Sequence, residues 1–519
     1  MRRFFNTAGP CRLDMHYALP ALDRLPTVRG LIERRACFDL HAPRQVGKTT
    51  ALLTLAQELT AAGTHTAVLV SVEEGAPFTD IGAAELAILQ SWRRSAAWQL
   101  RATNLEPPPW PVSAPGARVG DALAAWARAS PRPLVVFIDE IDALRGDVLI
   151  SVLRQVRAGY AGRPHDFPAS LALIGLRDVR DYKVAAGGSE RLGTASPFNI
   201  KVESLTLRNF TRDEVDALYH QHEVATGQRF LPEAVDRAFY WTQGQPWLVN
   251  ALARQLIEVV VPTDATGARA ITAADVDLAK EILIERQDTH LDSLAERLRE
   301  PRIRQIIEPM LAGGTLGDIP DNDRRFIVDL GLVRRDPAGG FEIANPIYRE
   351  VIPRSLAGGT RDSLPHIAPA WLTADGRLDA ARLLDAFLAF WRQHGEPLLA
   401  TAPYHEIAPH LVLMAFLHRV ANGGGTLDRE YAIGRGRMDL LLRRGPDALA
   451  VELKVWRDGQ PDPATDGVAQ LDRYLDGLGL PTGWLVVFDR RSAQPPIAVR
   501  TSAAVAMTPA GRSVTLVRA

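Results

Sequence analysis

The sequence is poor in cysteine, in long apolar runs and in net charge, and each shortage excludes a class of protein. Two cysteines, Cys11 and Cys37, in 519 residues do not make a disulfide framework and suit a reducing compartment, so a cytoplasmic protein is predicted. No apolar run approaches the length of a membrane span and no signal-peptide pattern is present, so no membrane partner is expected. A net charge of −1 excludes nucleic-acid binding through overall basicity and leaves only local patches.

Lysine is also scarce, and its positions single out two stretches. Of the 60 basic residues only five are lysine, namely Lys48, Lys183, Lys201, Lys280 and Lys454. Lysine supplies a compact point charge where arginine supplies a planar fork, so the two residues serve different purposes. Because Lys48 and Lys454 each fall inside a candidate motif, both are predicted to be functional.

A phosphate-binding stretch is present at residues 38–50, FDLHAPRQVGKTT. An apolar run, a loop and a helix-forming run follow one another, the context in which backbone N–H groups and a helix N-terminus bind phosphate. Lys48 is predicted to reach the β- and γ-phosphates and Thr49 to ligate Mg²⁺. Ala42 stands where the motif has its first glycine, which is tolerable if φ there is negative. The predicted nucleotide-binding residues of this loop are Ala42, Pro43, Arg44, Gln45, Val46, Gly47, Lys48, Thr49 and Thr50.

A second motif complements the loop. The apolar run 133–138 ends in Asp139 and Glu140, about ninety residues after Lys48. Asp139 is predicted to hold Mg²⁺ through its water shell, and Glu140 to polarise the attacking water. The two motifs together predict ATP and Mg²⁺ as cofactors and ATP hydrolysis as an activity.

Two further positions refine the class of ATPase. Arg177 follows the apolar run 170–176, where a residue that senses the γ-phosphate belongs, and its charge would lose that contact on hydrolysis. A surface role for Arg177 and a competing role for Arg180 stay open. Gly244-Gln245-Pro246 precedes a helix, and Pro246 is predicted to pack on the adenine, although the tripeptide is also an ordinary turn.

The pattern of elements predicts the architecture of the first 355 residues. Strand-like runs alternate with helices through residue 207, which predicts a doubly wound parallel sheet with its ligand at the carboxyl ends of the strands. Residues 211–290 read as helices without strands. Residues 293–355 read as two helices and a hairpin, the outline of a winged helix.

These features resemble a known class of proteins. Lys48, Asp139-Glu140, Arg177 and Gly244-Gln245-Pro246, followed by a winged helix, resemble the AAA+-related STAND clade of signalling ATPases. The phrases FNTAGP (5–10), HAPRQ (41–45) and IANPIY (343–348) resemble a widespread bacterial family of AAA-ATPase-like proteins. The resemblance covers roughly residues 1–355. It implies that nucleotide state switches the lid and winged helix, and it implies a homo-oligomer on ATP binding.

A second constellation lies near the C-terminus. Its elements read as a helix (405–420), three strands, a helix (464–479) and a strand (483–489). Glu452 and Lys454 are two apart on a strand and project from one face, and Asp439 on the preceding strand is predicted to lie beside them. Adjacent carboxylates are costly unless a divalent cation neutralises them, so Asp439 and Glu452 are predicted metal ligands. Lys454 would orient water or stabilise developing charge, and Gln470 on the next helix would contact substrate.

This arrangement resembles the PD-(D/E)XK nuclease superfamily. Asp439 and Glu452-x-Lys454 match its core motif, and Gln470 matches its helix residue. Glu406 matches the acidic residue on the first helix of many members and is an implied metal ligand, whereas Met438 replaces the proline of the pattern. The resemblance implies a nuclease dependent on Mg²⁺, or on Mn²⁺ in its place. The alternative is a half-buried strand with a surface Glu-x-Lys pair.

Local arginines would contact the nucleic acid, since such side chains neutralise phosphates. The candidates are Arg435, Arg437, Arg443, Arg444, Arg490 and Arg491. Acidic residues nearly balance them over the domain, so solvated surface charge is the alternative interpretation.

The expected fold class is α/β: a P-loop doubly wound parallel sheet with helical lid and winged helix, then a C-terminal α/β restriction-endonuclease-like domain. The predicted segments are 1–35 over the nucleotide site, 36–210 ATPase core, 211–290 lid, 291–355 winged helix, 356–397 linker and helix, and 398–519 nuclease-like domain. The leading interpretation is an ATP-binding and ATP-hydrolysing switch that controls a metal-dependent nuclease in bacterial defence, acting on DNA in preference to RNA. The alternatives are a regulatory ATPase whose C-terminal domain binds a partner or nucleic acid without cleaving it, and a DNA motor.

Overall fold

The structure is a computed structural model of the whole chain. It describes residues 3–101, 103–176, 202–262, 269–286, 297–298, 300–311, 319–336, 339–352, 371–401, 408–421, 426–433 and 436–519. The chain forms two compact units, Met1–Arg286 with Pro320–Pro346 and Gln287–Ile319 with Ile347–Ala519. Within the described ranges no helix is long and apolar enough to cross a membrane.

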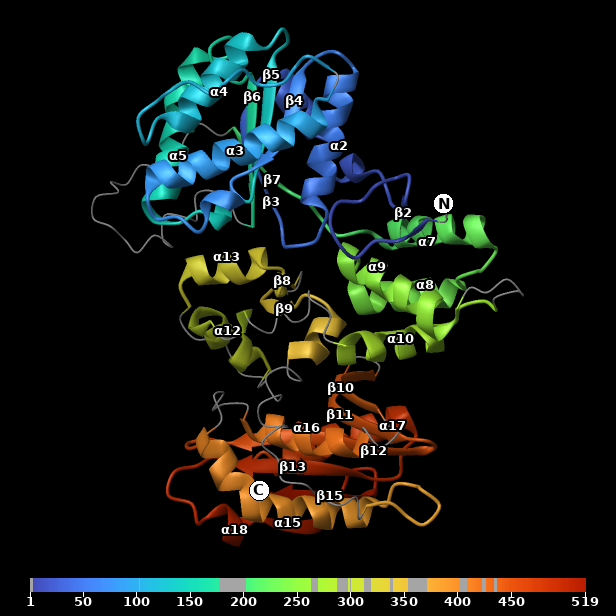
Figure 1. Cartoon of the computed structure of the whole chain (residues 1–519). Coiled ribbons are helices and arrows are strands. Elements are labelled where there is room, and N and C mark those ends of the chain that lie inside the picture. Colours follow the sequence, from blue (N-terminus) through green and yellow to red (C-terminus); the bar gives the residue numbers. More distant parts are fainter. Residues whose placement is uncertain are drawn as a thin grey trace. The chain divides into compact units, whose positions relative to one another are not determined.

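A five-stranded parallel sheet forms the centre of the first unit (Figure 1). Its strands are β3 (Cys37–His41), β4 (Thr66–Ser71), β5 (Leu134–Asp139), β6 (Ser170–Gly175) and β7 (Glu203–Thr206), in the order β4-β5-β6-β3-β7. Every neighbouring pair is parallel, which confirms the predicted parallel sheet. Because all five strands run in the same direction, the carboxyl ends of β3 and β5 lie at the same end of the sheet, with β6 between them.

Helices cover both faces of this sheet, which explains why its strands β4, β5 and β6 are continuous apolar runs. One face carries the 3₁₀ turn η1 (Ala21–Arg24), α1 (Val28–Glu33) and α2 (Lys48–Ala61). The other face carries α3 (Ile81–Gln99), α4 (Arg118–Ala129) and α5 (Gly146–Gly159). The short 3₁₀ turns η2, η3 and η4 span Glu73–Gly75, Ile141–Ala143 and Tyr160–Gly162.

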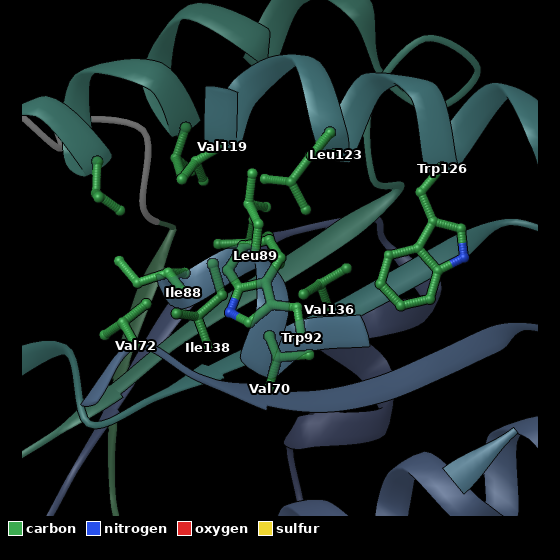
Figure 2. Packing of buried hydrophobic residues seen from close by; sticks show 14 of the residues in the cluster. Val70, Val72, Ile88, Leu89, Trp92, Val119, Leu123, Trp126, Val136 and Ile138 are labelled. Carbon is green, nitrogen blue, oxygen red and sulfur yellow. The ribbon is translucent and has the colours of Figure 1, made fainter. Parts of the chain in front are cut away.

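Trp92 on α3 lies at the centre of the core on the second face. Figure 2 shows it among aliphatic side chains of α3, β4 and β5, including Leu89, Val70 and Val136. Its ring is fully buried, and its indole N–H donates to the carbonyl of Ser71 at 3.0 Å. The side chain therefore ties α3 to the end of β4, next to the sheet edge that carries the candidate site.

Replacing Trp92 by alanine is expected to lower the free energy of unfolding of this unit by about 3–5 kcal/mol, because the change leaves a large cavity in a closely packed core. The control is Trp98→Ala on the same helix, whose side chain is exposed, and its effect should stay within about 0.5 kcal/mol. Urea unfolding of the full chain, followed by far-UV circular dichroism, measures both. Equal unfolding midpoints for the two variants would contradict the assigned core.

A helical segment follows β7. It contains α7 (Arg212–Thr226), α8 (Pro232–Thr242), α9 (Pro246–Gln255) with the π-helical turn η6 (Leu256–Val260), and α10 (Ala273–Arg286). Thr211 and Glu214 begin α7 with a capping box. The N-terminal strands β1 (Phe4–Phe5) and β2 (His16–Tyr17) pair in parallel, and they contact α9 and α7 respectively. The N-terminal segment is thus held by the helices that follow the sheet.

The two helices and the hairpin that are expected for a winged helix are present in the predicted order. They are α12 (Pro301–Leu311), α13 (Asp321–Asp329), β8 (Val333–Arg335) and β9 (Phe341–Ile343), with β8 and β9 antiparallel. α12 belongs to the second unit and the other three elements to the first. The winged helix therefore stays a prediction.

The second unit contains a six-stranded mixed sheet, in the order β10-β11-β12-β13-β15-β14. The strands are β10 (Thr426–Ile433), β11 (Gly436–Arg444), β12 (Asp447–Trp456), β13 (Gly483–Asp489), β14 (Ser502–Met507) and β15 (Ser513–Arg518). β12, β13 and β15 are parallel, and the other pairings are antiparallel. α17 (Ala464–Leu478) covers one face. On the other face Trp391 of α15 (Ala380–Thr401) and His410 of α16 (Ala408–Ala421) contact Phe488, and α18 (Ile497–Arg500) packs on α15.

The predicted start of the C-terminal domain at residue 398 stays a prediction, and the structure shows the helix in which that residue lies. α15 continues past Pro397 to Thr401, so residue 398 lies inside a helix. Phe390 and Trp391 contact Phe416 and Phe488 of the same unit, at 5.2 and 5.1 Å between ring centroids. These contacts place α15 in the same unit as the sheet that it covers.

Candidate functional site

The loop after β3 has the backbone of a phosphate-binding loop. Gln45 (φ +59°) and Gly47 (φ +98°) are left-handed, and α2 begins at Lys48 directly after Gly47. Residues in such alternating conformations form a concave row of N–H groups that suits an anion. Ala42 is buried and is not among the residues with positive φ, so the methyl group at the usual first glycine is accommodated.

Lys48 is folded back into this loop. Its ammonium donates to the carbonyls of Ala42 (2.6 Å) and Pro43 (2.9 Å). Burial lowers the pKa of the ammonium, while the negative charge of Asp139 acts against that shift. A point charge held by two carbonyls in a partly desolvated loop is available to exchange them for phosphate oxygens.

Thr49 connects the loop to the second motif. Its hydroxyl donates to Asp139 Oδ2 at 2.9 Å, although the two residues are 90 apart in the sequence. The contact follows from the sheet order, which brings the carboxyl ends of β3 and β5 to one edge. The N–H of Glu140 donates to the other carboxylate oxygen of Asp139 at 2.9 Å. Glu140 has φ +57°, a conformation that costs a non-glycine residue about 1–3 kcal/mol and is concentrated at functional sites.

Carboxylates crowd this edge of the sheet. Burial raises the pKa of Asp139, and the hydrogen bond from Thr49 opposes the shift. Burial, followed by the charges of Asp139 and Asp142, raises the pKa of Glu140 to about 7. Neighbouring buried carboxylates destabilise one another, and a divalent cation would relieve that repulsion.

A cavity of about 420 Å³ opens in front of these groups. Arg44–Thr50 of the loop and Glu140 line it, and so does Pro246, whereas Ala42 and Pro43 contribute only the carbonyls that hold Lys48. The rest of its wall comes partly from the N-terminal segment, which was predicted to lie over the nucleotide site, and partly from residues that no motif indicated. That wall consists of Asn6–Cys11, Tyr17–Leu19, Ala21, Arg24, Glu73, Phe210, Leu218, Trp247 and Asn250.

The Gly244-Gln245-Pro246 turn forms the start of α9 and lies against the entry to α7. Gly244 has φ +68°, and a Cβ there would lie 1.9 Å from the carbonyl oxygen of Phe210, so only glycine fits. The N–H of Phe210 donates to Gly244 at 2.8 Å. The Gln245 side chain caps the helix by accepting from Leu248 N at 2.6 Å, and Pro246 occupies the first turn. The turn thus sets Pro246 and Trp247 at the cavity.

Arg24 is the residue that sequence reasoning missed most clearly. It is 8% exposed, and its Nη1 donates to the carbonyls of Val46 (3.0 Å) and Arg208 (2.9 Å). Its guanidinium lies over the ring of Phe210, 4.7 Å from the centroid. One arginine among so many in the chain has no local signal of burial, and no motif could have identified it.

Several of the predicted site residues lie outside the part of the chain that the structure describes. Arg177, its competitor Arg180, Glu406 and Arg435 fall outside the described residues. Asp439 lies on β11, but its side chain is also outside the described part. The roles assigned to these residues stay predictions.

Glu452, Lys454 and Gln470 are brought together in the second unit. Lys454 Nζ donates to Glu452 Oε1 at 2.8 Å and to Gln470 Oε1 at 2.9 Å, and Gln470 Nε2 donates to Tyr474 Oη at 2.9 Å. Glu452 is fully buried, whereas a quarter (25%) of the Lys454 side chain is exposed. Gln470 thus contacts both Lys454 and Tyr474, and its predicted contact with substrate stays a prediction.

The register of the strands adds the backbone of Asp439 to this cluster. Leu440 of β11 pairs with Val451 of β12. Asp439 precedes Leu440 and Glu452 follows Val451, so these two positions are neighbours across an antiparallel pair. The register thus brings the two backbone positions together, and the predicted role of Asp439 as a metal ligand stays a prediction.

The candidate nucleic-acid arginines differ in their surroundings. Arg491 pairs with Asp489 at 2.7 Å and lies over the ring of Trp456, 3.4 Å from the centroid. Desolvation, followed by the charges of Arg500 and Arg457, lowers the pKa of Arg490. Arg490 is therefore placed among like charges, while the charge of Arg491 is already neutralised.

The two carboxylate sites differ in how well they fit a metal. Among the described side chains, no group of three His, Cys, Asp or Glu residues is arranged to hold one. Thr49 and Asp139 nevertheless fit Mg²⁺ bound with a nucleotide, because Mg²⁺ commonly takes one or two protein oxygens and completes its shell with phosphate and water. At the second site Glu452 already accepts from Lys454, and the other predicted ligands are not described.

No protein-family model and no curated protein sequence matches the chain. Among solved structures, the chain is similar to the Walker-type ATPase paby2304 of Pyrococcus abyssi, with 12% identity over 67% of this chain and 99% of that chain and a TM-score of 0.47. It is similar to the RuvB Holliday junction branch migration motor of Thermotoga maritima, with 15% identity over 63% and 92% of the two chains and a TM-score of 0.34. The Orc1 protein of Aeropyrum pernix in complex with DNA shows 15% identity over 66% and 94%, at a TM-score of 0.34. The residues of the site, rather than these distant similarities, carry the functional interpretation.

Proposed function

We propose that the first unit binds and hydrolyses ATP. The observation that carries this proposal is the 2.9 Å contact between Thr49 and Asp139, which joins two motifs 90 residues apart beside a phosphate-binding loop and a cavity. The loop N–H groups and Lys48 would bind the β- and γ-phosphates, and Thr49 and Asp139 would hold Mg²⁺. When bound, Mg²⁺ supplies charge neutralisation at the phosphates. Glu140, at the cavity wall, would orient the attacking water and take up its proton.

The second unit is proposed to be a nuclease. Support comes from the joined Glu452, Lys454 and Gln470 side chains and from the register that sets Asp439 beside Glu452. The partly exposed ammonium of Lys454 would stabilise negative charge that develops on a phosphodiester. Its hydrogen bond to Gln470 would orient the ammonium. Asp439 and Glu452, with Glu406, are the proposed metal ligands, and DNA is the preferred substrate.

The ATPase is proposed to control the nuclease, with a homo-oligomer forming on ATP binding and Arg177 sensing the γ-phosphate. A regulatory ATPase whose second unit binds nucleic acid or a protein partner without cutting is the second candidate. The ion pair between Lys454 and Glu452 favours it, because that pair already satisfies part of the charge that a metal would neutralise.

One experiment on the wild-type chain separates these functions. The purified protein is incubated with single- and double-stranded DNA and with RNA, in Mg²⁺ or Mn²⁺, with and without ATP, and both phosphate release and nucleic-acid cleavage are measured. Phosphate release together with ATP-dependent cleavage is expected. Phosphate release with retention but no cleavage of nucleic acid would replace the nuclease with the second candidate. Absence of both nucleotide binding and phosphate release would overturn the ATPase itself.

A further inference from the structure

Arg24 contacts the phosphate-binding loop from the side of the N-terminal segment. Its Nη1 donates to the Val46 carbonyl at 3.0 Å, and its Nη2 would lie 3.1 Å from a Cβ placed on Gly47. It is also one of the residues that line the cavity. The guanidinium therefore lies directly against the Val46–Gly47 peptide of the loop.

This contact determines where the Gly47 N–H points. In a planar trans peptide the C=O and the N–H point in opposite directions. Because Arg24 holds the Val46 carbonyl, the N–H of Gly47 is directed away from Arg24. Gly47 has φ +98° and immediately precedes α2, so this N–H belongs to the row of donors at the helix N-terminus that would face phosphate.

The charge of Arg24 is offset by Glu214, but without a direct ion pair. Among the described residues no carboxylate forms an ion pair with it. The carboxylate of Glu214 is occupied, since it accepts from Arg208 at 2.6 and 2.8 Å and from the N–H of Thr211 at 2.7 Å. Burial lowers the pKa of Arg24 to about 10, so the group stays charged at neutral pH. A buried cation held mainly by carbonyls is costly unless an anion joins it.

Arg24 has two possible roles: to stabilise the fold through the two carbonyls and the Phe210 ring, or to act on a bound nucleotide. The position of its charge distinguishes them. A neutral donor could satisfy both carbonyls and pack on the ring, so these contacts alone do not need a charged side chain. A polyphosphate bound in the cavity beside the loop would interact with the positive charge. We propose that Arg24 is a positioning residue for the nucleotide polyphosphate, which orients the Gly47 N–H and supplies buried positive charge behind the loop. The proposal rests on nucleotide binding by the first unit.

The test is the dependence of binding on the phosphates of the ligand. Affinities of ATP, ADP and adenosine are measured by calorimetry for the wild type, Arg24→Gln, Arg24→Lys and the control Arg29→Gln. Arg29 lies in the same segment, is half exposed and pairs with Glu58 on the surface. Arg24→Gln should weaken ATP and ADP about 10- to 100-fold, the range for a lost hydrogen bond to a charged group, and leave adenosine within about twofold. Arg24→Lys should fall between, since it keeps the charge but not the fork.

Other results contradict the proposal in distinct ways. Equal weakening of adenosine and ATP would show that Arg24 packs the site or contacts the base, and unchanged ATP affinity in Arg24→Gln would show that it does neither. If Arg24→Gln does not fold, Arg24→Lys decides alone, because a loss confined to ATP and ADP supports the proposal and a uniform loss overturns it. If the wild type binds no nucleotide, the proposed ATPase function itself is overturned. Results on the Arg24 variants do not test that function.

Discussion

Replacing Lys48 by alanine is expected to abolish ATP hydrolysis, with a loss of at least about 10²–10³-fold, and to weaken ATP binding as well. The variant removes the one ammonium that the loop holds through the carbonyls of Ala42 and Pro43. No other lysine lines the cavity in the described part of the chain, so no neighbouring ammonium can replace it there. Phosphate release at saturating ATP and calorimetric ATP affinity measure the two effects.

Glu140→Gln is expected to separate these effects. It keeps the shape of the side chain but removes the base, so turnover should fall by about 10²–10⁴-fold while ATP binding is retained or strengthened. Strengthened binding has a physical reason, because the substitution removes one of the carboxylates that crowd the phosphate side of the cavity. The control is Glu58→Gln, an exposed carboxylate on α2 outside the cavity. Hydrolysis at the wild-type rate in either Lys48→Ala or Glu140→Gln would show that the candidate site is not the ATPase centre.

Replacing Lys454 by alanine is expected to reduce nucleic-acid cleavage by at least about 10²-fold, since the ammonium is the cation placed to stabilise the developing charge. The substitution also leaves the fully buried Glu452 without the ion pair at 2.8 Å, so folding of the variant is checked by circular dichroism. Rates of plasmid and oligonucleotide cleavage, with ATP and Mg²⁺ or Mn²⁺ present, measure the effect. Arg473→Ala, an exposed cation on α17 that donates only to its own helix, is the control for loss of charge.

A double-mutant cycle with Gln470→Ala tests how Gln470 acts. Lys454 donates a hydrogen bond to Gln470, so if Gln470 acts by positioning Lys454, the losses of the two single variants should not add in the double variant. Additive losses would assign Gln470 a separate contact with substrate, as the sequence analysis expected. Cleavage at the wild-type rate by Lys454→Ala would remove the second unit from catalysis and favour the binding module.

The candidate nucleotide site shows how far local sequence carries the prediction. Gly47, Lys48 and Thr49 are recognisable because their chemistry is concentrated in a few adjacent residues, and Asp139-Glu140 because it ends a strongly apolar run. The structure brings Thr49 within 2.9 Å of Asp139, as the pairing of the motifs required. Arg24 was missed because what distinguishes it is burial against Val46 and Phe210, and no pattern in neighbouring residues records that.

In the second unit, too, some features follow from the sequence and others depend on packing. Glu452 and Lys454 share a face because strand side chains alternate, and the sequence alone states that. The hydrogen bond from Lys454 to Gln470 depends on how α17 lies on the sheet, which is a matter of packing. The structure also extends α15 past Pro397 to Thr401, although a proline inside a helix is unfavourable and the sequence favours an end before it.

The sequence by itself determined the kinds of chemistry that the chain carries: a phosphate-binding loop, an acidic strand end and a Glu-x-Lys strand. Adjacent residues and strand or helix periodicity are enough for these, because they depend on covalent spacing. Only the tertiary structure decided the contacts between distant segments, namely that of Arg24 with the loop and the hydrogen bond from Lys454 to Gln470. Such partners are chosen by burial and by contacts between distant segments, and those energies depend on the whole packed unit.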